Sequence, residues 1–270
     1  MQKASSDSQK FTAPTVDWPE TIAELDAQIA KDPRDARLWF ERGLKLGDAR
    51  LMHDAIMSFS RAIALDPFNG IYYRWRGHRH LNINQISEAC ADLELASRLI
   101  PDNWDVWYHL GLVHVLLGNY QLAELAYRKC AKAPTERKSN VICRTNWHYL
   151  CLMLQGKKEE AAAVLHAVPD DQTCTDYNLG YLEMLNFYKG FHDEDFMLKI
   201  DDALEGAARA ERCYRVCTHS FGMAMHYYAL GDKAHSREIL DYVLKIGEAD
   251  TWNTFGFQGA WYVTHHRDMF

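Results

Sequence analysis

Hydrophobic residues recur along the chain with the spacing of amphipathic helices, and proline repeatedly ends the helical runs. Asp66-Pro67 and Ile100-Pro101 each close an apolar run, and the two prolines lie 34 residues apart (101 minus 67). A fixed period of roughly 20–50 residues is typical of repeat proteins. The chain therefore divides into rows covering 36–69, 70–103 and 104–137.

Small and large residues occupy fixed columns in these rows. The small columns are Gly43, Gly77, Gly111; Ala55, Ala89, Ala123; and Ala62, Ala96, Cys130. The large columns are Trp39, Tyr73, Trp107 and Phe59, Leu93, Tyr127. Small residues allow two antiparallel helices to approach closely, and large ones fill the space between neighbouring pairs. Each row therefore predicts one helix-turn-helix unit.

The segments outside the three rows follow the same pattern less regularly. Trp18–Asp32 predicts a helix that caps the array, and residues 1–17 predict a flexible tail. Residues 138–250 predict three divergent repeats. The fourth pair of helices is expected at 144–154 and 158–167, and the sixth at 213–230 and 234–246. The fifth pair extends from 177 to 209, with its second helix at 195–209. Residues 251–268 predict a capping helix, and no linker interrupts 18–270, which we expect to form a single domain.

The columns resemble those of the tetratricopeptide repeat (TPR) family, whose consensus carries a large residue, Leu-Gly, Ala, an aromatic residue, Ala and Pro at these spacings. The run Asn103–Gly111, followed by Gly118-Asn119-Tyr120 and Ala123, is especially similar. The resemblance implies an all-α fold, a right-handed α-α superhelix of about five to six helix pairs. It also implies that the first helix of each pair lines a concave groove.

Composition narrows the functional classes. The chain of 270 residues is 48% hydrophobic and 25% charged, as in ordinary globular proteins. A formal net charge of -7 and a pI near 6.0 argue against nucleic-acid binding. The sequence shows no apolar run of membrane-spanning length and no signal-peptide core near its start. Seven cysteines without a CxxC pair favour reduced thiols, so we expect a cytoplasmic protein without a membrane partner.

The family's groove positions imply an aromatic and cationic ligand site. The predicted ligand-binding residues are Arg74, Trp75, His78, Tyr108, His109, Arg144, Asn146, Trp147, Tyr177 and Tyr181. Trp75, Tyr108 and Trp147 fit equally well as packing residues against the next helix.

Arg74, His78 and His109 form the most specific part of this prediction. In chaperone-tail-binding members of the family, a lysine and two asparagines stand at these positions and clamp a carboxylate. Here an arginine and two histidines occur instead, so the resemblance implies anion binding but not the chaperone tail. The alternative is that Arg74 pairs with an acidic neighbour and the histidines only pack.

Motifs for metals, cofactors and catalysis are absent from the sequence. His78 and His80 point to different helical faces, and Cys213 and Cys217 lack a histidine motif nearby, so no metal site is predicted. The sequence holds no GxGxxG, GxxxxGK[ST], GxSxG or HExxH motif, and no cofactor is expected. Residues one repeat apart could still share a catalytic site, for which the candidates are His78, His109, Tyr177 and Glu183.

Two functions therefore remain open at the level of sequence. The first is a binding module that captures an extended peptide, a chain terminus or a small anionic ligand in the groove. The second is an enzyme acting on a small polar or anionic substrate, with histidine as general acid or base and arginine as anion clamp. A groove open at both ends suits a peptide, whereas a groove plugged by the aromatic segment 251–261 suits a small molecule.

Overall fold

The computed structural model describes residues 18–198, 206–247, 254–267 and 269, so the expected tail at 1–17 lies outside the described residues. The described residues form fourteen helices and no strand, which confirms the all-α fold. The first seven helices are α1 (Trp18–Lys31), α2 (Ala36–Asp48), α3 (Met52–Leu65), α4 (Gly70–Asn82), α5 (Ile86–Leu99), α6 (Trp104–Leu117) and α7 (Tyr120–Cys130). The others are α8 (Asn140–Met153), α9 (Lys158–Leu165), α10 (Leu179–Tyr188), α11 (Glu194–Leu198), α12 (Gly206–Leu230), α13 (Lys233–Gly247) and α14 (Phe255–His266).

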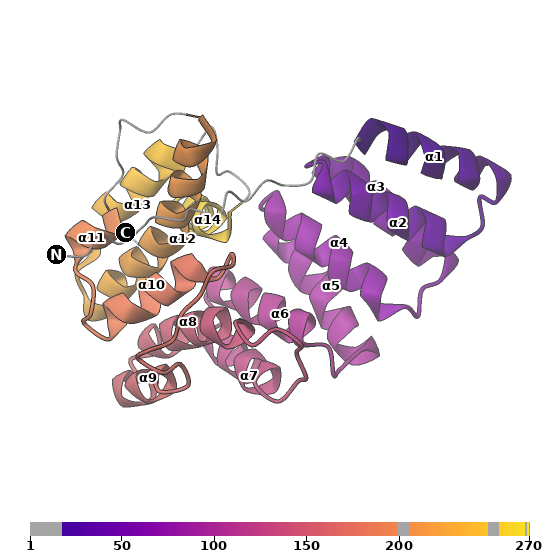
Figure 1. Cartoon of the computed structure of the whole chain (residues 1–270). Coiled ribbons are helices and arrows are strands. Elements are labelled where there is room, and N and C mark those ends of the chain that lie inside the picture. Colours follow the sequence, from indigo (N-terminus) through magenta and orange to yellow (C-terminus); the bar gives the residue numbers. More distant parts are fainter. Residues whose placement is uncertain (1–17, 199–205, 248–253, 268, 270) are drawn as a thin grey trace.

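Helices from α1 to α9 pack on their chain neighbours in order, which gives a solenoid of helix pairs (Figure 1). The first helices of the pairs also contact one another, α2 with α4, α4 with α6, and α6 with α8. This inner row forms the concave side of the array. The three pairs α2–α3, α4–α5 and α6–α7 correspond to the rows read from the sequence.

Glycine at the helix crossings sets how closely each pair packs. A Cβ atom added at Gly111 would lie 2.5 Å from the Tyr127 ring, and one added at Gly43 would lie 2.5 Å from the Phe59 ring. Both rings are fully buried. The aromatic residue of the second helix therefore occupies the space that a side chain on the first helix would fill.

A second repeated contact explains the column of large residues. Trp39 Nε1 donates to the Pro33 carbonyl at 3.1 Å, and Trp107 Nε1 donates to the Pro101 carbonyl at 2.6 Å. In the middle row the hydroxyl of Tyr73 donates to the Pro67 carbonyl at 3.1 Å. Each large side chain thus ties its own helix to the proline turn before it.

The arginine that precedes two of these glycines joins consecutive repeats. Arg42 pairs with Asp26 of α1 at 2.6 Å and donates to Ser58 of α3 at 2.9 Å. In the next row Arg76 donates to Ser60 of α3 at 2.9 Å and pairs with Asp92 of α5 at 2.7 Å. The repeated Arg-Gly pair therefore combines a bridge between repeats with a close crossing.

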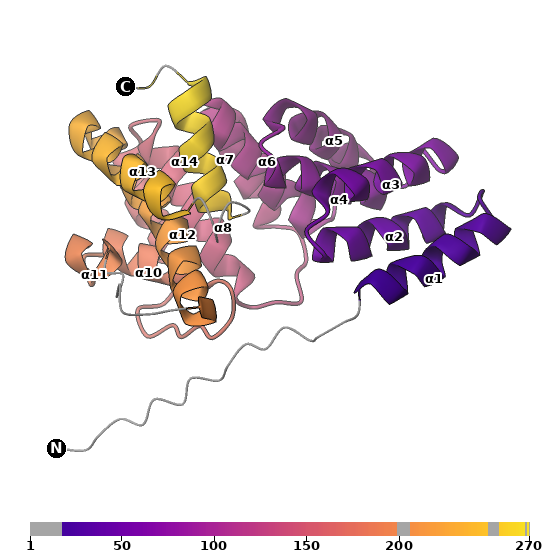
Figure 2. The ribbon, with the colours of Figure 1, turned by 90° about the horizontal axis from the view of Figure 1, so that it is seen from above.

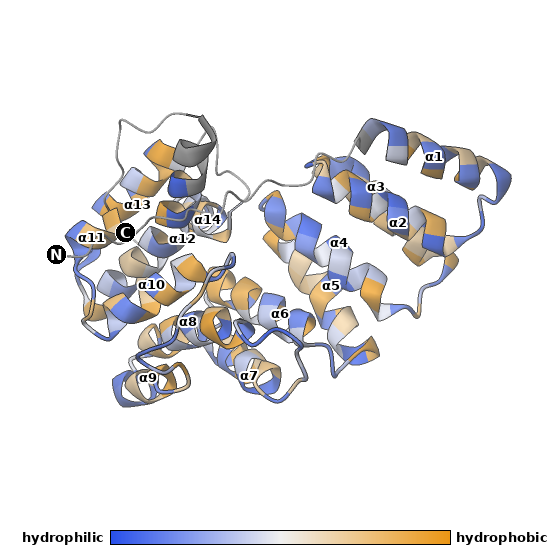
Figure 3. Cartoon of the chain, viewed as in Figure 1, coloured by the Kyte–Doolittle hydropathy of each residue, from blue (hydrophilic) through white to orange (hydrophobic). Residues whose placement is uncertain are grey.

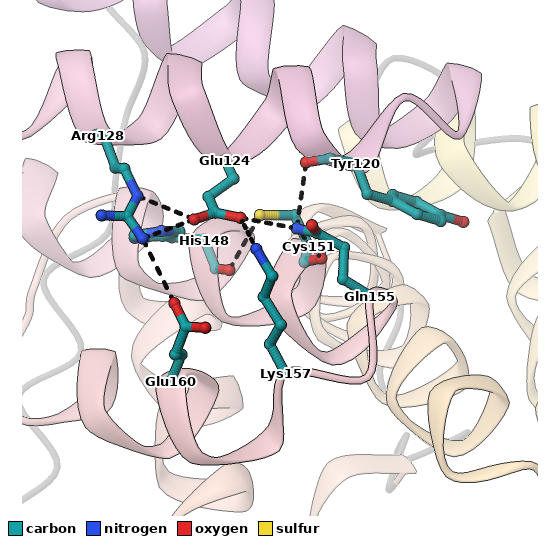
Figure 4. A network of polar contacts seen from close by, with 8 residues as sticks. All are labelled: Tyr120, Glu124, Arg128, His148, Cys151, Gln155, Lys157 and Glu160. Atoms are coloured by element: carbon teal, nitrogen blue, oxygen red, sulfur yellow. Dashed lines mark hydrogen bonds and ion pairs between the residues drawn. The ribbon is translucent and has the colours of Figure 1, made fainter.

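A buried carboxylate holds α7, α8 and α9 together at the point where the repeat pattern weakens (Figure 4). Glu124 pairs with Arg128 and with Lys157 at 2.6 Å each, and accepts a hydrogen bond from Gln155 at 3.1 Å. These charged donors lower the pKa of Glu124 to about 2 despite its burial. The cluster satisfies its own charges, and we assign it a structural role.

The C-terminal half departs from the predicted helix boundaries. The prediction of one helix over 195–209 was wrong for its last residues, because 206–209 belong to α12. Helix α12 runs from Gly206 to Leu230, so the predicted start at Cys213 was also wrong. Residues 206–212 contain no proline and only an initial glycine, so nothing breaks the helix before Cys213. The short helix α11 ends at Leu198, and the rest of the expected helix up to 205 lies outside the described residues.

Helix α14 returns to the concave side of the array, where it contacts α12, α13, α4 and α6 (Figures 1 and 2). The Thr254 hydroxyl caps it by accepting a hydrogen bond from the Phe257 amide at 3.0 Å. Gly256 permits a very close approach, because a Cβ there would overlap the carbonyl of Cys217 in α12. The expected capping segment 251–268 is described from Thr254 to Arg267.

Burial is uneven along the array. Hydrophobic and hydrophilic residues alternate around α2 and α3, near the N-terminal end of the array (Figure 3), whereas every residue of α6 from Val106 to Leu116 is buried. A helix that is apolar on all sides belongs inside the protein, and α6 is covered by neighbours on both sides of the array. Among the described helices, none combines the length and hydrophobicity needed to span a membrane.

The helix crossing at Gly111 provides a test of this packing. We expect Gly111→Leu to lower the free energy of unfolding by about 1–3 kcal/mol, because the new side chain must displace the buried Tyr127 ring. Urea unfolding followed by circular dichroism measures the change. Ala91→Leu, at an exposed position of α5, is the control and should stay within about 0.5 kcal/mol of the parent. Equal midpoints for the two variants would contradict the assigned crossing.

Candidate functional site

The candidate site lies where α4 and α6 face α14. Asn69 caps α4 by accepting a hydrogen bond from the Ile71 amide at 3.2 Å, which starts the helix just before its charged residues. Residues four apart share a helix face, so Arg74 lies above His78, and Trp75 lies above Arg79. The neighbouring helix α6 contributes an acidic, a phenolic and an imidazole group, Asp105, Tyr108 and His109.

Arg74 is buried and only partly paired. Its Nη2 lies 3.1 Å from Asp105 Oδ2, and its guanidinium carbon lies 4.2 Å from the centre of the Trp75 ring. Asp105 is half exposed, whereas Arg74 is 7% exposed. The Nε and Nη1 atoms of Arg74 are buried and make no hydrogen bond. Burial lowers the pKa of this guanidinium, although Asp105 opposes that shift.

Arg79 is a second buried guanidinium on the same face as Trp75. Its carbon lies 5.3 Å from the centre of the Trp75 ring, and its Nη1 donates to Asn82 Oδ1 at 3.3 Å. Burial lowers the pKa of Arg79 to about 10, and the nearby charge of Arg74 adds to this shift. Asp48 opposes the shift through its charge, but it forms no ion pair with Arg79. The Nε of Arg79 makes no hydrogen bond.

Together Arg74 and Arg79 bury two positive charges near one indole ring. Among the described residues only Asp105 lies within ion-pair distance of either guanidinium. A buried charge without a partner is costly, and it normally indicates a missing counter-charge. The local arrangement therefore favours an anion.

His78 and His109 lie side by side, but neither carries charge at neutral pH. Their ring centres are 4.5 Å apart, and each lies 5.7 Å from the centre of the Phe255 ring in α14. Burial lowers the pKa of His78 well below its usual range. Burial and the nearby charge of Arg74 lower the pKa of His109 to about 4. His109 Nδ1 lies 2.6 Å from the Asp105 carbonyl, so it carries the proton and donates to that oxygen.

Helix α14 covers this end of the groove. Besides Phe255, its Gln258 donates to the Asn82 carbonyl at the end of α4, at 2.8 Å. Beyond its last turn Arg267 donates to the hydroxyl of Tyr120 at 3.1 Å. The histidine pair is thus enclosed between two inner helices and the C-terminal helix.

The other predicted ligand residues lie elsewhere. Tyr108 is buried and stacks on Trp104, with ring centres 4.9 Å apart. Trp147 and Tyr181 are buried together, with ring centres 6.5 Å apart, beside Phe221. These aromatic residues belong to the core between α6, α8, α10 and α12.

The remaining predicted residues divide between the rim and the interior. Tyr177 is 52% exposed, and it lies near enough to Arg74 to influence the pKa of that guanidinium. Asn146 is buried in α8, and Arg144 is half-buried. Glu183 lies apart from the histidine pair and forms an ion pair with Arg215 of α12. Ligand binding by each of these residues stays a prediction.

Sequence reasoning missed Arg79. The signal was available, because Arg79 follows Trp75 by four residues and therefore shares its helical face. Arg79 stands between His78 and His80, and this stretch was interpreted only for the metal-binding potential of its histidines.

One group among the described residues has the chemistry of metal ligands. Cys90 and Glu94 of α5 and His114 of α6 place one ligand atom each within 4.8 Å of one another. Burial and the neighbouring carboxylate raise the pKa of the Cys90 thiol to about 11. Three ligands, one of them on a half-exposed glutamate, fall short of the four ligands that structural zinc sites use.

Comparisons with known proteins agree with the repeat geometry. Residues 76–136 match the sequence profile of the tetratricopeptide repeat family. The chain is 38% identical over 76 residues to the Hsp70-Hsp90 organizing protein of Triticum aestivum, a match that covers 28% of this chain and 13% of that relative. The chain therefore spans a small part of that relative's length.

Solved structures share the fold at low identity. A tetratricopeptide repeat protein from Parabacteroides merdae has a TM-score of 0.57 at 15% identity, covering 90% of this chain and 92% of its own. MamA has a TM-score of 0.52 at 23% identity, covering 65% and 92%. YrrB, a TPR protein with an unusual peptide-binding site, has a TM-score of 0.50 at 17% identity, covering 85% and 95%.

The neutral histidines predict how stability depends on pH. The lowered pKa values apply to His78, His109, His114, His148, His219 and His226. Unfolding returns each to a pKa near 6.5, so their contribution is complete above about pH 6.5 and is lost as pH falls towards about 4. His235, whose pKa is raised by Glu194, acts in the opposite direction.

A single buried histidine allows this pH dependence to be measured. Burial and the charge of Arg144 lower the pKa of His148 to about 4, so His148→Gln should reduce the loss of stability between pH 7.5 and pH 5. Urea midpoints at several pH values provide the measurement. His53→Gln, at an exposed position, should leave the pH profile unchanged. A profile that is flat in the parent protein would contradict the assignment of neutral buried histidines.

Proposed function

Because this chain belongs to the tetratricopeptide repeat family, we propose that it is a protein-binding module whose groove holds an anionic group of its ligand. Arg74 and Arg79 bind that group beside Trp75. The ligand is a peptide or protein terminus, or a small anionic molecule. The site faces α14 and is bordered by Asp105 and Tyr177.

The observation that carries this proposal is the unbalanced buried charge. Arg74 pairs with the carboxylate of Asp105 and Arg79 forms no ion pair among the described residues, and Arg74 keeps two buried nitrogen atoms without acceptors. A carboxylate or phosphate supplies acceptors to an arginine, often through two parallel hydrogen bonds. Asp105 is half exposed, so a ligand can replace it at little cost in buried contacts.

The relatives support protein binding but not a shared ligand. YrrB carries a peptide-binding site, and the wheat relative is an Hsp70-Hsp90 organizing protein. In this chain His78 and His109 replace the asparagines of the family's carboxylate clamp. Both histidines are neutral and enclosed by Phe255. We therefore propose anion recognition through arginine without the chaperone-tail contacts.

An enzyme acting on a small polar or anionic substrate is the second candidate. The position of α14 favours it, because Phe255 and Gln258 close the groove over the histidine pair and a closed site suits a small molecule. In that case His78 or His109 moves the proton and Arg74 holds the substrate. A neutral imidazole can accept a proton, but the lowered pKa values of His78 and His109 make them weaker bases than a histidine with a pKa near neutrality.

The cysteines support a location in the cytoplasm. All seven are free, and burial raises the pKa of Cys90 and Cys174 to about 11, which keeps these thiols protonated and unreactive. Reduced, packed cysteines are typical of cytosolic proteins.

Peptides with and without a terminal carboxylate test the proposal. We expect a mixture of pentapeptides without acidic side chains to bind the protein when the C-terminus is free, and to bind weakly when it is amidated. Arg74→Gln and Arg79→Gln should each weaken binding by roughly 10- to 150-fold, the value of one charge-assisted hydrogen bond. Fluorescence anisotropy measures the affinity, and circular dichroism checks the fold.

Arg98→Gln is the matched control, because Arg98 is 74% exposed on α5 and away from the groove. It should bind like the parent. Equal affinity for free and amidated peptides would contradict the proposal. Binding of acetate or phosphate without peptide binding would instead favour a small anionic ligand over a peptide terminus.

A further inference from the structure

Three different metal-binding groups meet where α5 packs against α6 (Figure 1). Cys90 and Glu94 stand four residues apart on α5, so they share one face of that helix. His114 belongs to the last turn of α6. The thiol, the carboxylate and the imidazole each offer one ligand atom, and the three atoms lie within 4.8 Å of one another. Two consecutive repeats thus bring these groups together.

The spacing of the ligand atoms fits a single metal ion. Cys90 Sγ lies 3.8 Å from Glu94 Oε1. Zinc holds sulfur at about 2.3 Å and carboxylate oxygen at about 2.0–2.2 Å, so a tetrahedral angle places these two ligand atoms about 3.6 Å apart. The observed separation is within about 0.2 Å of that value. Small side-chain rotations therefore suffice to complete the geometry.

His114 supplies the second, independent observation. Its side chain belongs to the buried set at 5% exposure, and its Nδ1 atom is buried without a hydrogen bond. Buried polar atoms without partners are uncommon in native proteins, and an ion is one explanation for them. One ring nitrogen of His114 lies in the cluster with the thiol and the carboxylate. A metal ion is thus the kind of partner that this imidazole lacks.

Glu94 leaves one side of the cluster open to solvent. Its side chain is 47% exposed, and its Oε2 lies 3.9 Å from Nη2 of Arg98, which is itself 74% exposed. An exposed ion pair contributes little to stability. Glu94 can therefore turn to a metal ion at little cost, and water has access to the same ion.

The donor set selects the metal. Magnesium and calcium prefer oxygen ligands throughout, whereas thiolate and imidazole favour zinc. Structural zinc sites use four protein ligands, but sites with three protein ligands keep a water molecule in the fourth position. The three groups and the open side of this cluster fit the second kind of site.

We propose that Cys90, Glu94 and His114 bind a zinc ion, with water as the fourth ligand. The thiol proton of Cys90 passes to solvent when the sulfur binds the metal. The ion links α5 of one repeat to α6 of the next and stabilises that interface. The site uses none of the groove residues, and it does not depend on the function proposed for the groove.

Zinc and cobalt titrations of the full chain test the proposal, after treatment with EDTA and under reducing conditions. We expect one zinc ion per chain by isothermal titration calorimetry, and a higher thermal midpoint with zinc but not with magnesium. Cobalt reports the ligands, because a bound thiolate gives a sulfur-to-cobalt charge-transfer absorption. Absence of zinc binding, or cobalt binding without that absorption, would overturn the proposal.

Three variants separate the ligands. Cys90→Ala and His114→Gln should each weaken zinc binding by more than about 100-fold, the largest loss usual for a residue outside the ligand set. Cys90→Ala should also abolish the cobalt absorption, whereas Glu94→Gln should weaken binding and keep it. Circular dichroism checks the fold, and the half-exposed Glu94 provides the test if His114→Gln does not fold. Unchanged zinc affinity in Cys90→Ala would contradict the assignment.

Two matched controls locate the metal. Cys174 is a half-buried cysteine outside the cluster, and His53 is an exposed histidine of α3. Cys174→Ala and His53→Gln should bind zinc like the parent and keep the cobalt absorption. Loss of the absorption in Cys174→Ala would place the metal at another cysteine and overturn the proposal.

Discussion

The close crossing of the two helices in each repeat is the constraint on which the rest of the structure depends. At Gly43 and Gly111 the ring of a residue from the second helix occupies the position where a side chain would otherwise stand. Because dense packing leaves no room to spare, the crossing fixes the separation of the helices and hence the tilt of one pair on the next. Repeating that tilt curves the array and brings α14 back onto α4 and α6 (Figure 2).

Burial sets the electrostatics of the concave face, where Phe255 of α14 encloses His78 and His109. Arginines exposed to water would stay hydrated, with their charges screened. Here Arg74 and Arg79 are nearly buried, and their pKa values are lowered by desolvation. The neighbouring histidines respond to the same environment by remaining neutral. The positive character of the site therefore rests on arginine alone, which keeps it independent of pH in the neutral range.

The sequence predicted the first three helix pairs because each carries the small and large columns that make the crossing. The fourth pair has Tyr149 where glycine is expected, and the structure accommodates it by stacking Tyr149 on Tyr188 and bonding its hydroxyl to His226 at 3.0 Å. Those partners come from α10 and α12, so no local pattern reveals them. The same reason hid Arg215 and His219 beside Glu183, and the bond from Gln258 to Asn82, which joins residues 176 positions apart.

The central claim is that α14 is a fixed wall of the groove, and amide hydrogen exchange of the intact protein tests it most directly. The account predicts that amides from Gln258 to His266 exchange slowly, together with those of α12, because α14 packs through Gly256 against Cys217 and is held to α4 by Gln258. Rapid exchange throughout α14, with α12 still protected, would contradict it. The groove would then be open, and Phe255 would not enclose His78 and His109 in solution.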